Sequence, residues 1–485
     1  MINGNPGDLA YPFQRSEPIA VSAAPFVNKT DFIVEGYGSV PVTNGDPKWL
    51  PTRVKAFIAA QIIMMRPAEI YICNGSWSEA EYLVNSLERK GMLERLTAYE
   101  NVFVARTDPR DAMERGTYVT TNDPDSFKRK KRSHTGFAFA RWMSHSQSQS
   151  EIYTRFTGCM RGRVMYVIPF TMGPIGGRYS INAVQLTDSP FVVLNMRLLT
   201  RVSSSIWDAI GNADFVRCVH TVGRPRPITV ANKYNWLCHT ARFFLCHRLE
   251  ANEIWSYGST FGENAFLSKK ALGLRLASFR GWKEGWLAVH AALIAIKGPS
   301  GKEVFGCVSL PKGAGKTEIR FLGDDVVWIM VTPDRKLYAL APENGIFACP
   351  DNSTREQNPN MFKMLSKDAI LVNCATTNRG RFFWDGLENF LEENELVKDW
   401  KNEKWTIEQK RTPSHVNCHY TVFTSSAPNV HPYWELSTGV PLSFIVFGCK
   451  RTDQMPLVYE TESWEHGVTM AAGIRTISHS PLDKP

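Results

Sequence analysis

The sequence predicts an α/β protein with two lobes of mixed sheets, one of them a P-loop-type nucleotide-binding lobe. First, the chain has 485 residues, which is more than one hydrophobic core usually organises. Second, helix-like and strand-like apolar runs alternate along it. Third, a Gly-Ala-Gly-Lys-Thr segment at 313–317 follows a strand-like run and precedes a helix-compatible stretch. This is the context that a phosphate-binding loop requires.

The composition indicates a globular protein, and its net charge limits the classes of partner that it would suit. Hydrophobic residues make up 43% and charged residues 21% of the chain, a balance that excludes disordered and fibrous classes. The formal net charge of +9 would suit a nucleic acid, a membrane surface or an anionic metabolite, because a cationic cleft concentrates all three. No apolar run approaches the roughly 18 residues of a membrane span, so we expect no membrane partner.

The cysteines and the first residues indicate a compartment. Ten cysteines are scattered without a Cys-x-x-Cys pair, so neither a zinc ribbon nor a disulfide framework is expected. A reducing compartment follows, and we predict the cytoplasm. Asp8, Glu17 and Asp31 argue against an acidic-poor transit peptide, although a mitochondrial location stays open.

The N-terminal elements are predicted from composition and period. Residues 1–47 are rich in Pro, Gly, Asn and Ser, and we interpret them as a loosely ordered leader, with structure beginning near Trp49. The run 52–65 has apolar residues at helical spacing, and 69–73 is typical of a short buried strand.

Two polar segments follow. The basic run at 128–132 resembles a nucleic-acid patch. A solvated loop is the favoured interpretation because no aromatic residue is interleaved with it. The Ser/Gln tract at 144–150 is expected to be a surface loop as well.

The rest of the chain predicts strands, a helix and a second lobe. The runs 165–170 and 191–194 are predicted to be strands separated by Gly-Pro and Asp-Ser-Pro turns. Residues 271–290 have the spacing of a helix, broken or kinked around Gly281. The runs 291–296 and 304–310 are predicted to be buried strands joined by a turn at 298–301.

The segment after residue 310 carries the clearest chemistry. Gly313, Ala314 and Gly315 let backbone N–H groups curl around phosphate oxygens. Lys316 can neutralise the terminal phosphates, and the Thr317 hydroxyl can hold the bridging magnesium. Leu occupies position 310, where the standard pattern has Gly, so a chance turn is the alternative until its neighbours are considered.

Asp324 and Asp325 form a carboxylate pair shortly after this loop. Adjacent carboxylates repel each other unless a cation or protons relieve them, so a pair near a phosphate site indicates metal binding. A charged turn before the next strand is the alternative.

These motifs belong to a larger ordered set. Its members are Asn-Ala-Phe-Leu-Ser-Lys-Lys at 264–270, Lys-Glu-Gly-Trp-Leu-Ala-Val-His at 283–290, the Gly-Lys-Thr loop, Gly-Asp-Asp at 323–325, Pro-Glu-Asn-Gly at 342–345, Gly-Cys-Met-Arg-Gly-Arg at 158–163, the run 165–174, Leu-Thr-Asp-Ser-Pro at 186–190, Pro-Leu-Val-Tyr-Glu at 456–460 and Ser-Trp-Glu-His-Gly-Val at 463–468. In this order they resemble the GTP-dependent class of phosphoenolpyruvate carboxykinases, from about Trp49 to Arg475.

The resemblance implies a fold, an activity and a monomer. The fold would be carboxykinase-like, with a substrate-binding domain at 48–285 and a nucleotide- and metal-binding domain at 286–485. The family continues past the position of Arg475 through a lid and a guanine pocket, so we expect the second domain to be incomplete. The activity would convert oxaloacetate and GTP reversibly into phosphoenolpyruvate, carbon dioxide and GDP.

The resemblance also implies residue roles. Lys270, His290 and Asp325 would ligate a catalytic Mn²⁺, with Asp324 supporting the metals. Mg²⁺ would accompany GTP at Thr317. Lys269, Lys316 and Arg115 would act in catalysis, and the nucleotide would contact 313–317 and Lys450.

Several substrate positions differ from the family pattern. The predicted substrate-binding residues are Phe261, Gly262, Lys312, Asn417 and His419. Phe261 stands where the family has Tyr, and Glu263 where it has Gly. His419 replaces a clamping Arg, whose planar fork of donors histidine cannot reproduce. Glu114 stands at another Arg position, beside Arg115.

Two further hypotheses therefore accompany the enzyme. A catalytically impaired paralogue that binds metal or nucleotide for regulation or assembly is the alternative. Nucleic-acid binding through 128–132 is a distant third, so we expect no nucleic-acid partner.

Overall fold

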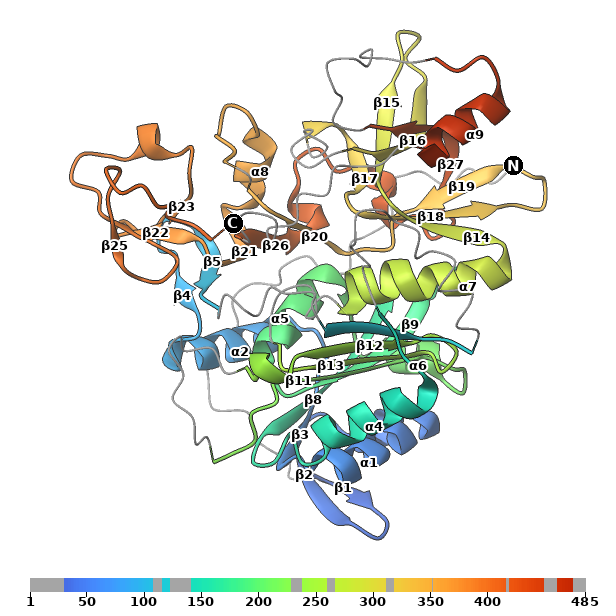
Figure 1. Cartoon of the computed structure of the whole chain (residues 1–485), viewed down its shortest axis with the longest axis vertical. Coiled ribbons are helices and arrows are strands. Elements are labelled where there is room, and N and C mark those ends of the chain that lie inside the picture. The colour runs from blue at the N-terminus through green and yellow to red at the C-terminus, as the bar shows by residue number, and fades with distance from the viewer. Residues whose placement is uncertain are drawn as a thin grey trace.

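The computed structural model describes residues 30–107, 116–122, 141–227, 238–259, 267–310, 318–350, 352–415, 418–448 and 460–473, and of residues 267–270 and 471–473 only the backbone. Figure 1 shows a large sheet in the lower lobe and several smaller sheets in the upper lobe. The predicted class, α/β with two lobes of mixed sheets, is confirmed.

The lower lobe is built on one eleven-stranded sheet. Its order within the described residues is β1 (Thr30–Val34), β2 (Gly38–Asn44), β3 (Glu69–Ile72), β8 (Val164–Met172), β9 (Ile181–Thr187), β11 (Val216–Thr221), β13 (Glu253–Tyr257), β12 (Phe244–Arg248), β6 (Thr117–Thr120) and β7 (Arg141–Trp142), with β10 (Arg201–Val202) paired to β8. β8 and β9 pair antiparallel, whereas β3 with β8 and β9 with β11 pair parallel.

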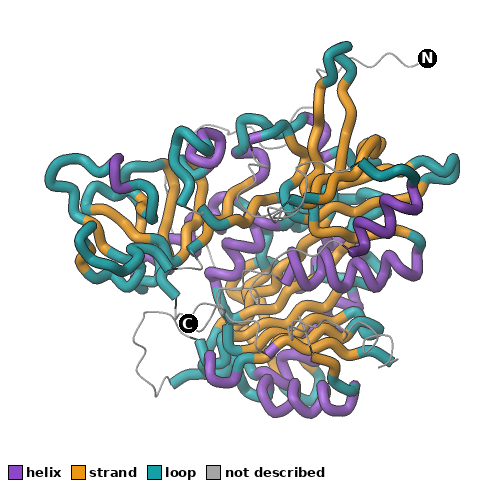
Figure 2. Tube along the Cα trace, turned by 45° about the horizontal axis from the view of Figure 1, so that its top comes forward, coloured by secondary structure: helices purple, strands orange, loops and turns teal. Residues whose placement is uncertain are grey.

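Helices cover both faces of this sheet (Figures 1 and 2). One face carries α1 (Thr52–Met65), α4 (His145–Phe156) and α6 (Ile206–Ile210); the other carries α2 (Trp77–Arg89), α5 (Pro190–Leu199), the π-helix η6 (Leu267–Leu276) and α7 (Ala277–Glu284). The bounds of α1 match the predicted 52–65. Its buried residues Val54, Phe57, Ile58, Ile62 and Met65 recur at helical spacing.

The upper lobe contains three sheets. The seven-stranded one has the order β14 (Trp286–His290), β18 (Val326–Val331), β19 (Leu337–Leu340), β27 (Val440–Phe447), β16 (Glu303–Ser309), β15 (Ala292–Lys297) and β17 (Phe321–Gly323). The five-stranded one has the order β20 (Gly345–Ala348), β26 (His419–Phe423), β21 (Lys367–Val372), β5 (Glu100–Ala105) and β4 (Glu94–Arg95). The four-stranded one has the order β23 (Phe382–Phe383), β22 (Ala375–Thr377), β24 (Val397–Lys398) and β25 (Lys404–Trp405).

Short helices complete the described residues. They are α8 (Pro359–Met364), α9 (Trp464–Gly473) and the 3₁₀ turns η1 (Pro47–Trp49), η5 (Thr240–Arg242), η8 (Glu388–Phe390), η9 (Thr424–Ser426) and η10 (Pro432–Glu435). In the part of the chain that the structure describes, no helix combines the length and apolar character needed to cross a bilayer.

The run 191–194 is a helix, so its prediction as a strand is wrong. α5 begins with Pro190 at its first position, where a proline needs no N–H partner and its fixed φ suits a helix. Its residues are buried nearly all round, because the helix lies between the large sheet and the upper lobe (Figure 1). A helix buried on all sides has no polar stripe, so periodicity could not separate it from a buried strand.

Three other predictions are corrected. Residues 30–44 form the hairpin β1–β2, paired to β3, so the predicted leader is structured there; residues 1–29 lie outside the described part. The tract 144–150 begins α4 through a capping box of Ser144 and Gln147. The helix predicted at 271–290 ends at Glu284, and 286–290 form β14. The basic run 128–132 is outside the described residues.

The predicted strands at 69–73, 165–170, 291–296 and 304–310 are confirmed as β3, β8, β15 and β16. β4 and β5 lie within 48–285 of the sequence, yet β5 pairs parallel with β21 of the upper lobe. The lobes are therefore not entirely continuous in sequence.

Candidate active site

His290 and Asp325 are in contact at the end of β14 and the start of β18, two neighbouring strands of the seven-stranded sheet. β14 and β18 pair antiparallel, with His290 opposite Val326. The end of β14 therefore lies beside the start of β18. His290 Nε2 is 2.5 Å from Asp325 Oδ1, and the Ala291 N–H donates to the Asp325 carbonyl at 3.2 Å.

This pair offers an imidazole nitrogen from the last residue of β14 and a carboxylate oxygen from the residue that precedes β18. The His290 side chain is 61% exposed and that of Asp325 is 14% exposed, so the pair opens to solvent on the imidazole side. Imidazole and carboxylate are donors that Mn²⁺ accepts. Two of the three predicted ligands are thus brought together, and their donor set fits a divalent cation.

The third predicted ligand lies on an element packed against these strands. Lys269 and Lys270 belong to η6, which contacts both β14 and β18; the positions of their side chains are not described. π-Helical segments are rare and are frequent at functional sites. Within the described residues, no cluster of three or more His, Cys, Asp or Glu side chains could hold a metal. The predicted site would take its third ligand from Lys270, and a lysine does not belong to a cluster of this kind.

The predicted nucleotide residues follow strands that end at this same edge. β16 and β27 pair parallel, with Ser309 opposite Phe447. The segment 313–317 follows β16, and Lys450 follows β27. β15 starts opposite the end of β16, with Ala292 facing Val308, and only Ala291 separates it from His290. The sheet therefore brings the metal pair and the ends of β16 and β27, which the two nucleotide segments follow in sequence, to one edge, a common place for ligand sites.

Most other predicted site residues lie outside the described residues: Arg115, Phe261, Gly262, Lys312, Gly313, Ala314, Gly315, Lys316, Thr317, Asn417 and Lys450. Asp324 is described, is 8% exposed and directly precedes Asp325.

His419 is described but lies in the five-stranded sheet, opposite Val372 of β21. Its side chain is fully buried, and its ring packs edge-on against Phe347 at 4.5 Å between centroids. The structure therefore joins His290 to Asp325 and places His419 in another sheet.

A buried histidine holds the residue that precedes the predicted substrate segment. Ser259 is the last described residue before 260–266, and its carbonyl is bonded to His220 Nε2. A carbonyl only accepts, so Nε2 carries the proton. His220 Nδ1 lies 2.7 Å from Thr187 Oγ1, and burial lowers the pKa of His220. The neutral tautomer therefore accepts at Nδ1 from the Thr187 hydroxyl.

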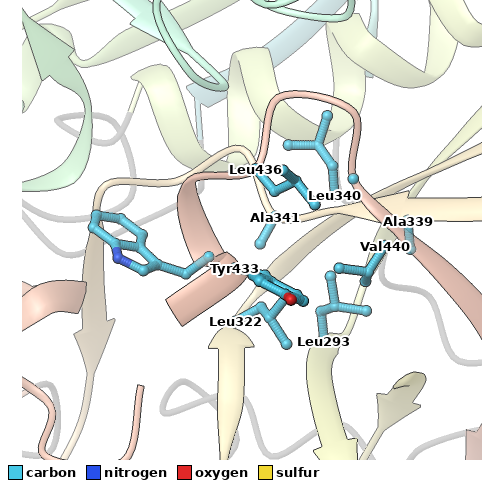
Figure 3. A pocket seen from close by; sticks show the side chains of 10 residues that line it. Leu293, Leu322, Ala339, Leu340, Ala341, Tyr433, Leu436 and Val440 are labelled. Atoms are coloured by element: carbon cyan, nitrogen blue, oxygen red, sulfur yellow. The ribbon is translucent and has the colours of Figure 1, made fainter. Parts of the chain in front are cut away.

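A small pocket lies beside β17, β19 and η10 (Figure 3). Figure 3 shows the Tyr433 ring surrounded by Leu293, Leu322 and Val440. All ten residues that line this pocket are apolar or aromatic, so it offers no cation to an anionic substrate.

Sequence reasoning missed Glu343 as a contributor to this site. Its motif, Pro-Glu-Asn-Gly at 342–345, was recognised without a role for any member. Glu343 Oε2 accepts from the N–H of Val326 at 3.1 Å, directly after Asp325. Only its position in a family motif could have drawn attention to it, since a buried Glu has no pattern of its own.

Two family models cover nearly the whole chain. Residues 56–282 match the phosphoenolpyruvate carboxykinase N-terminal domain, and residues 286–480 match the phosphoenolpyruvate carboxykinase C-terminal P-loop domain.

Curated relatives agree with these models. A phosphoenolpyruvate carboxykinase [GTP] from Haemonchus contortus is 40% identical over 474 residues, covering 92% of this chain and 76% of its own length. A cytosolic form from Bos taurus is 35% identical, covering 90% and 72%. A mitochondrial form from Homo sapiens is 34% identical, covering 90% and 70%. The chain belongs to the phosphoenolpyruvate carboxykinase family, in its GTP-dependent class.

Proposed function

We propose that this chain is a GTP-dependent phosphoenolpyruvate carboxykinase that interconverts oxaloacetate and GTP with phosphoenolpyruvate, carbon dioxide and GDP. The observation that carries this proposal is the sheet edge that holds both the His290–Asp325 contact and the ends of β16 and β27, the strands that precede the two predicted nucleotide segments in sequence. The family models and the named relatives support it.

The chemistry assigns tasks to the predicted metal ligands and to the lysines near the phosphates. The C–C bond to the departing carboxylate breaks and leaves its electron pair as an enolate. The enolate oxygen then attacks the γ-phosphorus, and the bond from that phosphorus to GDP breaks. A divalent cation held by His290, Asp325 and Lys270 would supply stabilisation of negative charge there.

The chain's own lysines would provide fixed positive charge. From its place in the Gly-Lys-Thr motif, Lys316 would neutralise the terminal phosphates. Lys269 would offset negative charge on the phosphate or the enolate. As a metal ligand, Lys270 requires a neutral amine, whereas Lys269 keeps its proton. The Thr317 hydroxyl would hold the Mg²⁺ that accompanies GTP.

Steady-state formation of phosphoenolpyruvate from oxaloacetate, with GTP, ATP or no nucleotide and with or without Mn²⁺, tests the proposal. We expect turnover only with GTP and Mn²⁺. Lys316→Ala should lower kcat by about 100-fold or more, because it removes charge stabilisation of the transferred phosphoryl. Lys302→Ala, which changes an exposed lysine in the turn before β16, is the control and should leave kcat nearly unchanged. Absent turnover in the wild type, or an unaffected Lys316→Ala variant, would contradict the proposal.

A catalytically impaired paralogue is the second candidate. Three substitutions relative to the family pattern, Glu114, Glu263 and His419, motivate it. The placement of His419 favours it, because a side chain buried against Phe347 does not offer a substrate the charged fork of an arginine. Binding of GTP and Mn²⁺ without turnover in the same assay would support this candidate over the enzyme.

We further propose a cytoplasmic monomer that binds no nucleic acid. None of the nine cysteines within the described residues belongs to a disulfide, which is compatible with a reducing compartment. The relatives include cytosolic and mitochondrial forms. Cell fractionation tests the compartment, and sedimentation of the full chain tests the oligomeric state.

A further inference from the structure

We propose that Glu343 is a positioning residue for the candidate metal site: its carboxylate orients Asp325, and the C-terminal end of α5 fixes Glu343 in turn. This inference rests on the proposed function for the identity of the metal. It assigns a role to a residue that touches neither substrate nor metal.

The peptide unit between Asp325 and Val326 is held from both sides. Its carbonyl accepts from the Ala291 N–H at 3.2 Å, and its N–H donates to Glu343 Oε2 at 3.1 Å. A peptide unit is planar, so two bonds in opposite directions fix its orientation. Since this unit contains the carbonyl of Asp325, it also restricts the direction of the Asp325 side chain toward His290.

Glu343 is suited to this task by its burial. The residue is 3% exposed, and a close-packed interior leaves a buried side chain little freedom to change its rotamer. Burying a carboxylate is costly unless hydrogen bonds compensate. The bond that Glu343 Oε2 accepts from the Val326 N–H therefore offsets part of the cost of burying this side chain.

Arg201 holds the backbone on which Glu343 sits. Its side chain is 7% exposed and donates to the Pro342 carbonyl at 2.8 Å and to the Glu343 carbonyl at 3.5 Å. It also pairs with the half-exposed Glu435 at 2.9 Å. Arg201 begins β10, just after α5, so this contact ties the motif to the lower lobe.

Asn344 and Gly345 complete the attachment. The last carbonyls of a helix have no partner within it, and Asn344 supplies donors for those of α5. Its N–H donates to Leu199 at 3.0 Å, and its Nδ2 donates to Leu198 at 3.2 Å. A Cβ at Gly345 would lie 2.4 Å from the Leu198 carbonyl oxygen, so only glycine permits this approach. The segment 342–345 is thus bonded to the end of α5 through Asn344, while Glu343 accepts from the Val326 N–H beside the candidate metal ligand Asp325.

Binding of Mn²⁺ alone to the full chain, measured by calorimetry without substrate, tests the inference. Glu343→Asp keeps the charge but withdraws the oxygens by one methylene, so it should weaken Mn²⁺ affinity about 10- to 100-fold, the usual effect of losing an outer-shell partner. Glu343→Gln keeps an oxygen acceptor at the same reach and should retain most of the affinity.

Glu435→Gln is the matched control. It alters the exposed partner of Arg201 and leaves the Arg201 contacts with Pro342 and Glu343 in place, so Mn²⁺ affinity should not change. Thermal unfolding of each variant separates positioning from folding, since a purely structural role would lower Tm without this order of affinities. If Glu343→Asp does not fold, Asn344→Ala replaces it and should also weaken Mn²⁺ binding.

Several outcomes overturn the inference: unchanged affinity in Glu343→Asp or in the replacing Asn344→Ala, a Glu343→Gln variant as weak as Glu343→Asp, or no Mn²⁺ binding by the wild type. A wild-type chain that shows the expected order of affinities but forms no phosphoenolpyruvate would support the inference and contradict the proposed function. The two failures are therefore distinguishable.

Discussion

At the scale of residues, the contact between His290 and Asp325 is better explained by function than by stability. The His290 side chain is 61% exposed, and exposed ion pairs contribute only about 0–1 kcal/mol. Both residues could be predicted from sequence because each lies in a family motif. Glu343 could not be assigned a role, because its partner Val326 is 17 residues away and only the fold brings them together.

A partly buried histidine, His415, near the predicted substrate clamp should make the protein acid-sensitive. Burial, aided by Lys401, lowers the pKa of His415 from 6.5 to about 4. The unfolded chain therefore binds the proton first as the pH falls. The stability contributed by neutral His415 is complete above pH 6.5 and is lost progressively down to about pH 4.

Thermal unfolding of His415→Gln at pH 7 and pH 5 checks this prediction. The wild type should lose about 2 kcal/mol more than the variant between these pH values, because one proton is taken up on unfolding. His145→Gln, at the exposed start of α4, is the control and should follow the wild type. Equal losses in the wild type and His415→Gln would refute the assignment.

At the scale of elements, the sequence predicted α1 and β3 closely because each has one buried face and a clear period. α5 was mistaken for a strand because it is buried all round. The sequence predicted a helix over 271–290 with a break at Gly281. The helix instead ends at Glu284, and residues 286–290 form β14. Gly281 lies inside α7, where a Cβ would be 2.4 Å from the Trp286 carbonyl oxygen. The glycine therefore permits close packing of α7 on β14, and the helix continues past it.

Gly281→Ala should lower Tm even though alanine favours a helix interior by about 1 kcal/mol over glycine. The added methyl must displace β14, which ends at His290, and overpacking of this kind costs about 1–3 kcal/mol. Trp282→Ala is the control in the same helix, since that side chain is 86% exposed and should matter little. A Gly281→Ala variant more stable than wild type would show that α7 does not approach β14 this closely.

At the scale of the whole molecule, the sequence predicted two lobes and the family but not how the lobes are joined. β4 and β5 come early in the chain and pair with the upper lobe, a long-range contact that no local pattern encodes. The junction at 342–345 likewise depends on distant carbonyls of α5. The candidate site therefore depends on both lobes, although its metal pair comes from one sheet.

Anomalous diffraction from crystals of the full chain grown with Mn²⁺ and GTP would test the central claim most directly. The claim is that the His290–Asp325 edge is the metal site of a GTP-dependent carboxykinase. We expect a manganese peak about 2.0–2.3 Å from His290 Nε2 and from an Asp325 carboxylate oxygen, as for divalent cations with such ligands. Bound manganese elsewhere, with the His290–Asp325 contact unchanged, would contradict the claim.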